Sequence, residues 1–117
     1  MIKGIGLDVT EIERIKAAHL LTPKFKARIL TVNELDRFSK MKETRQLEFL
    51  AGRFAAKEAF AKAMGTGIGK HCSFHDIEVN SNEGGKPVLY FKGREVNGHV
   101  SITHTKQFAA AQVILVE

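Results

Sequence analysis

The N-terminal segment alternates apolar residues with small or polar ones, as a half-buried strand does. Over residues 1–9 the two faces of this strand carry Ile5, Leu7 and Val9 on one side and Gly4, Gly6 and Asp8 on the other. The glycines leave the Asp8 face bare, so another backbone or a ligand can approach it closely. Thr10 and Glu13 form a capping-box pattern, which predicts that a helix begins where the strand ends and runs to about Leu20.

The strongest helical pattern runs from about Thr44 to Met64 and ends at Gly65. It carries two apolar stripes, and a helix that is apolar on two faces is normally buried between two layers. The first stripe is Leu47, Leu50, Ala51, Phe54 and Ala61, and the opposite one is Phe49, Ala56, Phe60 and Ala63. We expect a sheet on one side of this helix and further helix on the other.

The remaining elements follow from local start signals and from alternation. Thr22-Pro23 predicts a short helix to about Leu30, and Thr31 with Glu34 repeats the capping-box pattern for a third helix. Strands are predicted at Phe74–Asn80, Val88–Lys92, Val100–Thr105 and Phe108–Val116. Helices first and antiparallel strands later predict an α+β fold, in which an antiparallel sheet packs on one long central helix. We expect a single domain over residues 1–117.

Composition and charge narrow the possible partners. Apolar content of 44% and charged content of 26% are typical of a soluble globular protein. Residues 1–62 carry 13 Lys and Arg against 8 Asp and Glu, so the whole net charge of +5 lies in this half. Such a surface favours nucleic acid, a phosphorylated ligand or an acidic protein, although a merely solvated basic surface would look the same.

The compartment is expected to be the cytoplasm. No segment reaches the roughly 20 apolar residues that a membrane span requires, and Asp8, Glu11 and Glu13 interrupt any secretory apolar region. The single cysteine, Cys72, fits a reducing compartment and a small packing residue. Basic residues are not interleaved with aromatic ones, and no helix-turn-helix signature is present, so nucleic-acid binding is not expected.

Two acidic residues form the first candidate site. Glu58 falls inside the first apolar stripe of the long helix, where a carboxylate is costly unless a cation or hydrogen-bond donors meet it. Asp8 lies at a strand-to-helix corner, and two carboxylates completed by waters and phosphate oxygens suit Mg²⁺. The structural alternatives are a salt bridge from Glu58 to Lys62 and a helix-start carboxylate for Asp8.

A glycine-rich loop forms the second candidate site. Gly65-Thr66-Gly67-Ile68-Gly69 follows Lys62 directly, and glycines allow backbone N–H groups to turn toward an anion such as a phosphate. The glycines come after the helix rather than before it, so this is not a P-loop. Gly65 alone would be explained as an ordinary helix C-cap.

The strand Val100–Thr105 offers a third candidate. Alternation places His104 on the apolar side with Val100 and Ile102, and Ser101 on the other side. A lone histidine on an apolar strand face is usually a hydrogen-bonded core residue. Ser, His and an acid are all present, but no nucleophile-elbow sequence supports a hydrolase triad.

Four motifs together resemble the holo-acyl-carrier-protein synthase family, the small bacterial 4′-phosphopantetheinyl transferases. They are Gly4-Ile-Gly6-Leu7-Asp8 with Glu11–Ile15, the helix Phe54–Lys62 with its glycine loop, Gly85-Lys86-Pro87, and Val100–Thr105. The resemblance spans essentially the whole chain in the order and spacing of the family. Two departures are slight: Phe54 stands where related sequences often have tryptophan, and Thr103 where many have serine.

The resemblance implies transfer of 4′-phosphopantetheine from coenzyme A to a serine of acyl carrier protein, in support of fatty acid biosynthesis. It implies that Asp8 and Glu58 bind Mg²⁺, and that Lys62 meets the phosphates of coenzyme A. The residues implied to line the coenzyme A pocket are Gly65, Thr66, Gly67, Gly85, Lys86, Pro87, Ser101 and His104. Members of this class are homotrimers with active sites between protomers, so a homotrimer is expected.

Acyl carrier proteins are strongly acidic, so the basic first half becomes the expected docking surface. The expected contacts are Arg14, Lys24, Phe25 and Arg28, with Arg45 and Arg53 as secondary ones.

The proton of the attacking serine has several candidate acceptors: a water on the metal, Glu58 or His104. The competing interpretations are a nonenzymatic basic binding module and a structural oligomerisation protein, and both leave Glu58 in its apolar stripe unexplained.

Overall fold

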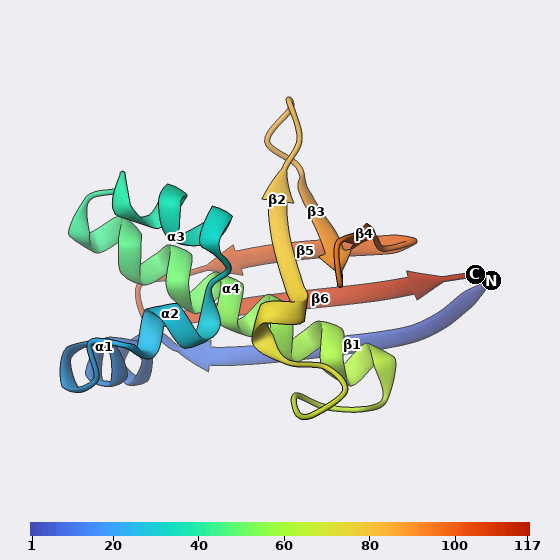
Figure 1. Cartoon of the computed structure of the whole chain (residues 1–117), viewed down its shortest axis with the longest axis horizontal. Coiled ribbons are helices and arrows are strands. Elements are labelled where there is room, and N and C mark those ends of the chain that lie inside the picture. Colours follow the sequence, from blue (N-terminus) through green and yellow to red (C-terminus); the bar gives the residue numbers. More distant parts are fainter.

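The computed structural model describes residues 1–117, with helices in the first half of the chain and most strands in the second (Figure 1). The helices are α1 (Ile12–Leu21), α2 (Phe25–Ile29), α3 (Val32–Ser39), α4 (Glu43–Met64) and the 3₁₀ turn η1 (Phe74–Asp76). The strands are β1 (Ile2–Glu11), β2 (Ile77–Ser81), β3 (Pro87–Phe91), β4 (Arg94–Glu95), β5 (Gly98–His104) and β6 (Phe108–Val116). None of the helices is both long and apolar enough to cross a membrane.

The predicted α+β fold with antiparallel strands on a long helix is confirmed, but the strands divide into two sheets. The larger sheet has the order β1-β6-β5, and the smaller one has the order β2-β3-β4, each with antiparallel neighbours. Helix α4 lies across the larger sheet, and the β2–β3 hairpin projects away from it (Figure 1). The predicted strand at Phe74 begins later, because residues 74–76 form η1 first.

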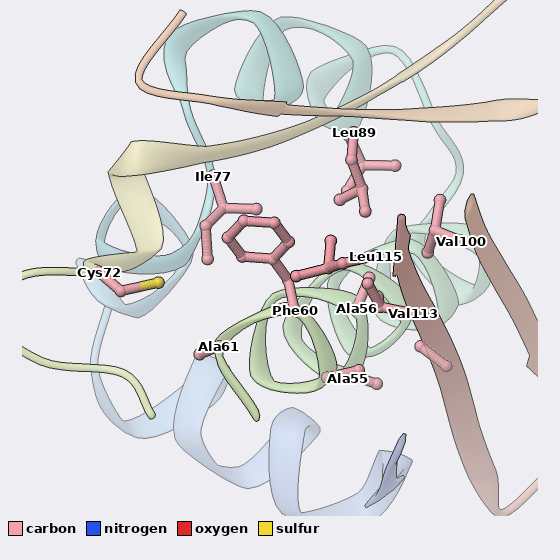
Figure 2. Packing of buried hydrophobic residues seen from close by; sticks show 13 residues of the cluster. Ala55, Ala56, Phe60, Ala61, Cys72, Ile77, Leu89, Val100, Val113 and Leu115 are labelled. Carbon is pink, nitrogen blue, oxygen red and sulfur yellow. The ribbon is translucent and has the colours of Figure 1, made fainter. Parts of the chain in front are cut away.

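Residues of both apolar stripes of α4 are buried, but the two clusters of core residues divide the helix along its length rather than by stripe. Phe60 and Ala56 belong to a cluster of 13 residues with the two sheets. Figure 2 shows the Phe60 ring close to Ile77 of the smaller sheet, with Val113 on β6 of the larger sheet. Leu50 belongs to a second cluster of 9 residues, formed with α1, α2 and α3. The core residues of α4 therefore pack with the sheets over its second half and mainly with the small helices over its first half.

Of the three helix N-caps predicted from local start signals, one is confirmed and two are wrong. The Thr31–Glu34 capping box is confirmed, with both of its hydrogen bonds present. The predicted Thr10 cap is wrong, because β1 continues through Glu11 and the Thr10 hydroxyl donates to Asp8 instead. The predicted Thr22 N-cap is also wrong: Thr22 is the C-cap of α1, and α2 begins only at residue 25.

The faces of β1 are reversed relative to the usual rule that the apolar side is buried. The glycine face packs against α4, whereas Ile5, Leu7 and Val9 are 57%, 58% and 61% exposed. The alternation itself was predicted correctly. The half-buried strand and the close approach of another backbone to its glycine face are confirmed, because only glycines allow the α4 backbone to lie this close to the strand.

Candidate functional site

Close packing of β1 on α4 brings the first site together. A Cβ atom added at Gly6 would overlap the Ala59 carbonyl, and one added at Gly4 would overlap the Ala63 carbonyl. The helix backbone therefore rests directly on the glycine face of the strand, as predicted from its bareness. Asp8 comes next along that same face, so its side chain lies beside α4 rather than in open solvent.

The Asp8 carboxylate has two partners and little exposure. Its Oδ1 accepts a hydrogen bond from Lys62 Nζ at 3.1 Å, and its Oδ2 accepts one from Thr10 Oγ1 at 2.8 Å. The Asp8 side chain is 14% exposed, whereas Lys62 is 51% exposed. Lys62 Nζ also donates to the Leu7 carbonyl at 3.1 Å. The lysine thus spans from α4 to β1 and covers the strand at this point.

Glu58 lies one helical turn before Lys62 and faces the same region. Burial raises the pKa of Glu58, the negative charge of Asp8 raises it further, and Lys62 lowers it. The alternative of a Glu58–Lys62 salt bridge is wrong for this structure, because Lys62 makes its ion pair with Asp8. A half-buried carboxylate that shares its site with a second one is electrostatically unfavourable unless a cation joins them.

The donor set fits Mg²⁺ by its chemistry. Magnesium takes oxygen ligands and usually keeps several waters while binding one or two protein carboxylates. Asp8 and Glu58 supply two, and no group of three or more His, Cys, Asp or Glu side chains in this chain is placed to hold a metal ion. A metal here would draw its remaining ligands from water and from a bound phosphate.

The glycine loop caps α4. Gly65 adopts a left-handed conformation at φ 83°, and the N–H groups of Thr66 and Gly67 donate to the Ala61 carbonyl at 3.2 and 3.1 Å. These amides are used by the helix terminus, so they do not form the anion-binding nest that the glycines allowed. No atom lies within 4 Å of the positions where Cβ atoms would stand on Gly65 and Gly67, which leaves the loop surface open.

The other predicted pocket residues lie elsewhere in the chain. Gly85, Lys86 and Pro87 lie at the far turn of the β2–β3 hairpin (Figure 1), where Gly85 has φ 80°. Ser101 is on the exposed outer face of the larger sheet. His104 ends β5, is exposed, and has Nδ1 3.6 Å from Glu48 Oε2 on α4. The structural alternative of a core histidine is therefore wrong, and the pocket role implied for His104 stays a prediction.

Two edges of one sheet separate the predicted residues. Asp8 lies on β1 and His104 on β5, and β6 runs between these strands. In the register, Asp8 pairs with Ala111, which in turn pairs with Ile102. One chain therefore presents the carboxylates at one edge of its larger sheet and the histidine at the other.

The predicted docking residues differ in how exposed their side chains are. Arg14 on α1 and Lys24 and Arg28 around α2 are exposed, and Phe25 is half-buried between them. Arg45 is on α4, with Nη1 3.6 Å from Glu48 Oε1.

Arg53 is only 7% exposed, so it has almost no surface to offer a docking partner. Its guanidinium lies 4.2 Å from the Phe49 ring centroid, and its Nε has no hydrogen-bond partner. Burial lowers the pKa of Arg53 to about 10, and the nearby Arg37 lowers it as well.

Sequence reasoning missed a buried ion pair between Lys57 and Glu34. Both side chains are fully buried, and Lys57 Nζ lies 2.6 Å from Glu34 Oε1. The sequence offered only a weak signal for this pair. Lys57 belongs to a helix with apolar stripes on two faces, which allows a lysine to be buried, but the capping box already accounted for Glu34. Only the packing of α3 against α4 reveals the pair.

Comparisons with known proteins agree with these motifs. A model of the 4′-phosphopantetheinyl transferase superfamily matches residues 4–115. A holo-[acyl-carrier-protein] synthase of Bacillus pumilus is 62% identical, over 98% of this chain and 96% of the relative, and one of Bacillus subtilis is 54% identical over the same shares.

Solved structures give the same result. A holo-(acyl-carrier-protein) synthase of Bacillus anthracis in complex with CoA (3′,5′-ADP) has a TM-score of 0.87 and 50% identity, over 98% of this chain and 96% of the other. A Neisseria meningitidis holo-[acyl-carrier-protein] synthase has a TM-score of 0.87 and 33% identity, with both chains fully covered.

Proposed function

Because this chain belongs to the 4′-phosphopantetheinyl transferase superfamily, we propose that it transfers 4′-phosphopantetheine from coenzyme A to a serine of apo-acyl carrier protein, releasing adenosine 3′,5′-bisphosphate. The observation that carries the proposal is the meeting of Asp8, Glu58 and Lys62 where β1 packs on α4. The Bacillus anthracis relative in complex with CoA (3′,5′-ADP) supports coenzyme A as the donor. The proposed setting is the cytoplasm, where the product serves fatty acid biosynthesis.

Asp8 and Glu58 are proposed to hold Mg²⁺. When bound, the ion would supply positive charge to the pyrophosphate and to the departing bisphosphate. The raised pKa of Glu58 supports this assignment, because its causes are burial and the charge of Asp8, both of which a cation would offset.

Lys62 is proposed to neutralise phosphate charge beside the carboxylates. Phosphoryl-type transfer depends mainly on positioning and charge neutralisation, with little covalent help from the protein. Its ammonium is half-exposed and hydrogen-bonds Asp8 and the Leu7 carbonyl, both on β1. A flexible lysine at that place can reach an incoming phosphate without leaving the neighbourhood of Asp8.

A homotrimer with active sites between protomers is proposed from two features of the sheet. The carboxylates and His104 lie at opposite edges, so one chain alone does not bring the expected pocket residues together. The exposed apolar stripe of Ile5, Leu7 and Val9 is an unusual surface for a monomer and fits burial against another copy. In such a trimer, Ser101 and His104 of one protomer would complete the pocket of the next.

The carrier protein is proposed to dock on α1 and α2. Arg14, Lys24 and Arg28 are exposed there, and Phe25 offers a partly buried apolar anchor. A positive surface of this kind speeds and orients the encounter with an acidic partner.

The decisive experiment measures the mass of apo-acyl carrier protein after incubation with coenzyme A, Mg²⁺ and this protein. We expect a mass gain equal to one phosphopantetheine, which disappears with Asp8→Ala or with added chelator. No gain with the wild-type protein would contradict the proposal. A nonenzymatic basic module would in addition show no metal-dependent, saturable binding of coenzyme A.

A further inference from the structure

Lys57 is the neighbour of Glu58 on α4, and its side chain is fully buried. Its ammonium donates three hydrogen bonds: to Glu34 Oε1 at 2.6 Å, to the Ile29 carbonyl at 2.7 Å and to the Phe74 carbonyl at 3.1 Å. A lysine ammonium has three donors, so every one is used. A buried charge this well satisfied fixes the relative positions of the groups that meet it.

The three acceptors come from three different elements. Ile29 ends α2, Glu34 belongs to α3, and Phe74 begins η1. The second oxygen of Glu34 accepts from the Val79 N–H at 2.8 Å, which adds β2 to the same network. One ammonium on α4 therefore joins α2, α3 and η1 directly, and β2 through Glu34.

The position of helix α2 depends on this network more than the positions of α3, η1 and β2 do. It has only five residues, and helices this short are not stable on their own. The carbonyls at the end of a helix lack partners within it, and Lys57 supplies one for Ile29. A second tie comes from η1, where His75 Nε2 lies 2.5 Å from the Ala27 carbonyl.

Lys57 and Glu58 point in different directions from the same turn of α4. Consecutive helical residues are about 100° apart around the axis, so Lys57 faces α2 and α3 while Glu58 faces Asp8 on β1. A single turn thus holds both the end of α2 and one of the two carboxylates.

We propose that Lys57, paired with Glu34, is a positioning residue that fixes α2, and with it the carrier-protein docking surface, relative to the Asp8–Glu58 centre. The inference rests on the proposed function, because it assigns α2 the docking role. Lys57 itself touches neither substrate. Its effect is exerted through the place of Phe25 and Arg28 on α2.

The test uses the paired variant Glu34→Gln with Lys57→Met. Removing one partner alone would leave an uncompensated buried charge, which is strongly destabilising, whereas removing both charges avoids this cost. The pair also keeps the net charge, so attraction of an acidic carrier protein over long range is unchanged. The matched control is Asp36→Asn with Lys40→Met, which removes an exposed ion pair of 3.1 Å from α3.

We expect the paired variant to raise KM for acyl carrier protein by about tenfold or more, since small misplacements of a positioning element are costly. The dissociation constant of coenzyme A with Mg²⁺ should stay at the wild-type value, and amide exchange should accelerate in α2. The control should match the wild type in all three. Equal losses in both substrates, or an unchanged KM in the folded variant, would overturn the inference.

His75→Ala is the second variant, and it decides the question if the paired variant does not fold. This variant removes the contact between the His75 ring and the Ala27 carbonyl of α2, and His75 is exposed. We expect a smaller rise in KM for the carrier protein alone, and an unchanged KM would overturn the inference. Failure of the proposed function is distinguishable, because the wild-type protein would then show no transfer at all.

Discussion

At the scale of single residues, Glu58 is held where its ionised form is unfavourable. Burial and the charge of Asp8 both raise its pKa above the ordinary 4.5. The neighbouring Lys62 offsets this only in part, since its ammonium hydrogen-bonds Asp8 and the Leu7 carbonyl. Groups whose pKa is shifted by burial together with a like charge are typical of functional sites.

This pKa shift makes a prediction about stability in the absence of metal. Since the folded chain binds the Glu58 proton more tightly than the unfolded chain does, the ionised glutamate reduces stability as pH rises through its pKa. Glu58→Gln should therefore unfold at a higher denaturant concentration than the wild type, and the difference should grow from pH 4 to its plateau above the raised pKa.

Chemical denaturation in the presence of chelator measures this difference, and added Mg²⁺ should stabilise the wild type but not the variant. At the same time, Glu58→Gln should lose phosphopantetheine transfer by about 10²-fold or more, as expected when a charge-stabilising group is removed. A variant that is less stable than the wild type at pH 8, or fully active, would contradict this account.

Arg14 allows the docking surface to be tested one charge at a time. Arg14→Glu on α1 should raise KM for acyl carrier protein by about tenfold, through lost attraction and new repulsion, and leave coenzyme A affinity unchanged. Steady-state kinetics with each substrate varied in turn measure both. Lys92→Glu is the control, because it changes charge equally at an exposed position on the β3–β4 turn; an equal effect there would show that only net charge matters.

Some residues of the candidate site could be predicted from the sequence, and others could not. Asp8, Glu58 and Lys62 could be predicted to lie together, because glycines, a helix stripe and family motifs all pointed to them. The buried Lys57–Glu34 pair could not, because nothing local distinguishes a buried lysine from an exposed one. Arg53, expected at the surface, is buried against Phe49 by packing of the second core cluster.

At the scale of elements, the β1–α4 contact positions the site. Gly6→Ala should destabilise the chain by about 1–3 kcal/mol, because a Cβ would push the Ala59 carbonyl away from the strand. It should also lower transfer activity by separating Asp8 from Glu58. Denaturation and kinetics measure the two effects together.

Gly69→Ala is the matched control, because open space surrounds that position and its φ is not in the left-handed region. Its stability should stay within about 0.5 kcal/mol of the wild type. If Gly6→Ala were equally harmless, close approach of α4 to β1 would not be what positions Asp8.

At the scale of the whole molecule, the exposed stripe on β1 predicts self-association. Leu7→Lys should convert the proposed trimer into a smaller species and abolish transfer, because a charge would stand in the buried interface. Light scattering coupled to size exclusion measures the mass.

Val32→Lys is the control for this change, since Val32 on α3 is 82% exposed and lies outside the larger sheet. It should leave the mass unchanged. A wild-type protein that is monomeric and active would remove the reason for an interface at Ile5, Leu7 and Val9.

The sequence by itself determined the long helix, the order of helices and strands, the Thr31 cap and the proximity of Asp8 to Glu58, because these follow from periodicity, local hydrogen bonding and the family motifs. Tertiary structure alone decided that α4 is the segment that packs on the glycine face of β1, that the strands form two sheets, that Lys62 pairs with Asp8, and that Lys57 meets Glu34. These outcomes depend on close approach between segments distant in sequence. The local sequence around a glycine or a lysine does not show whether its neighbours in the folded chain are water or another helix.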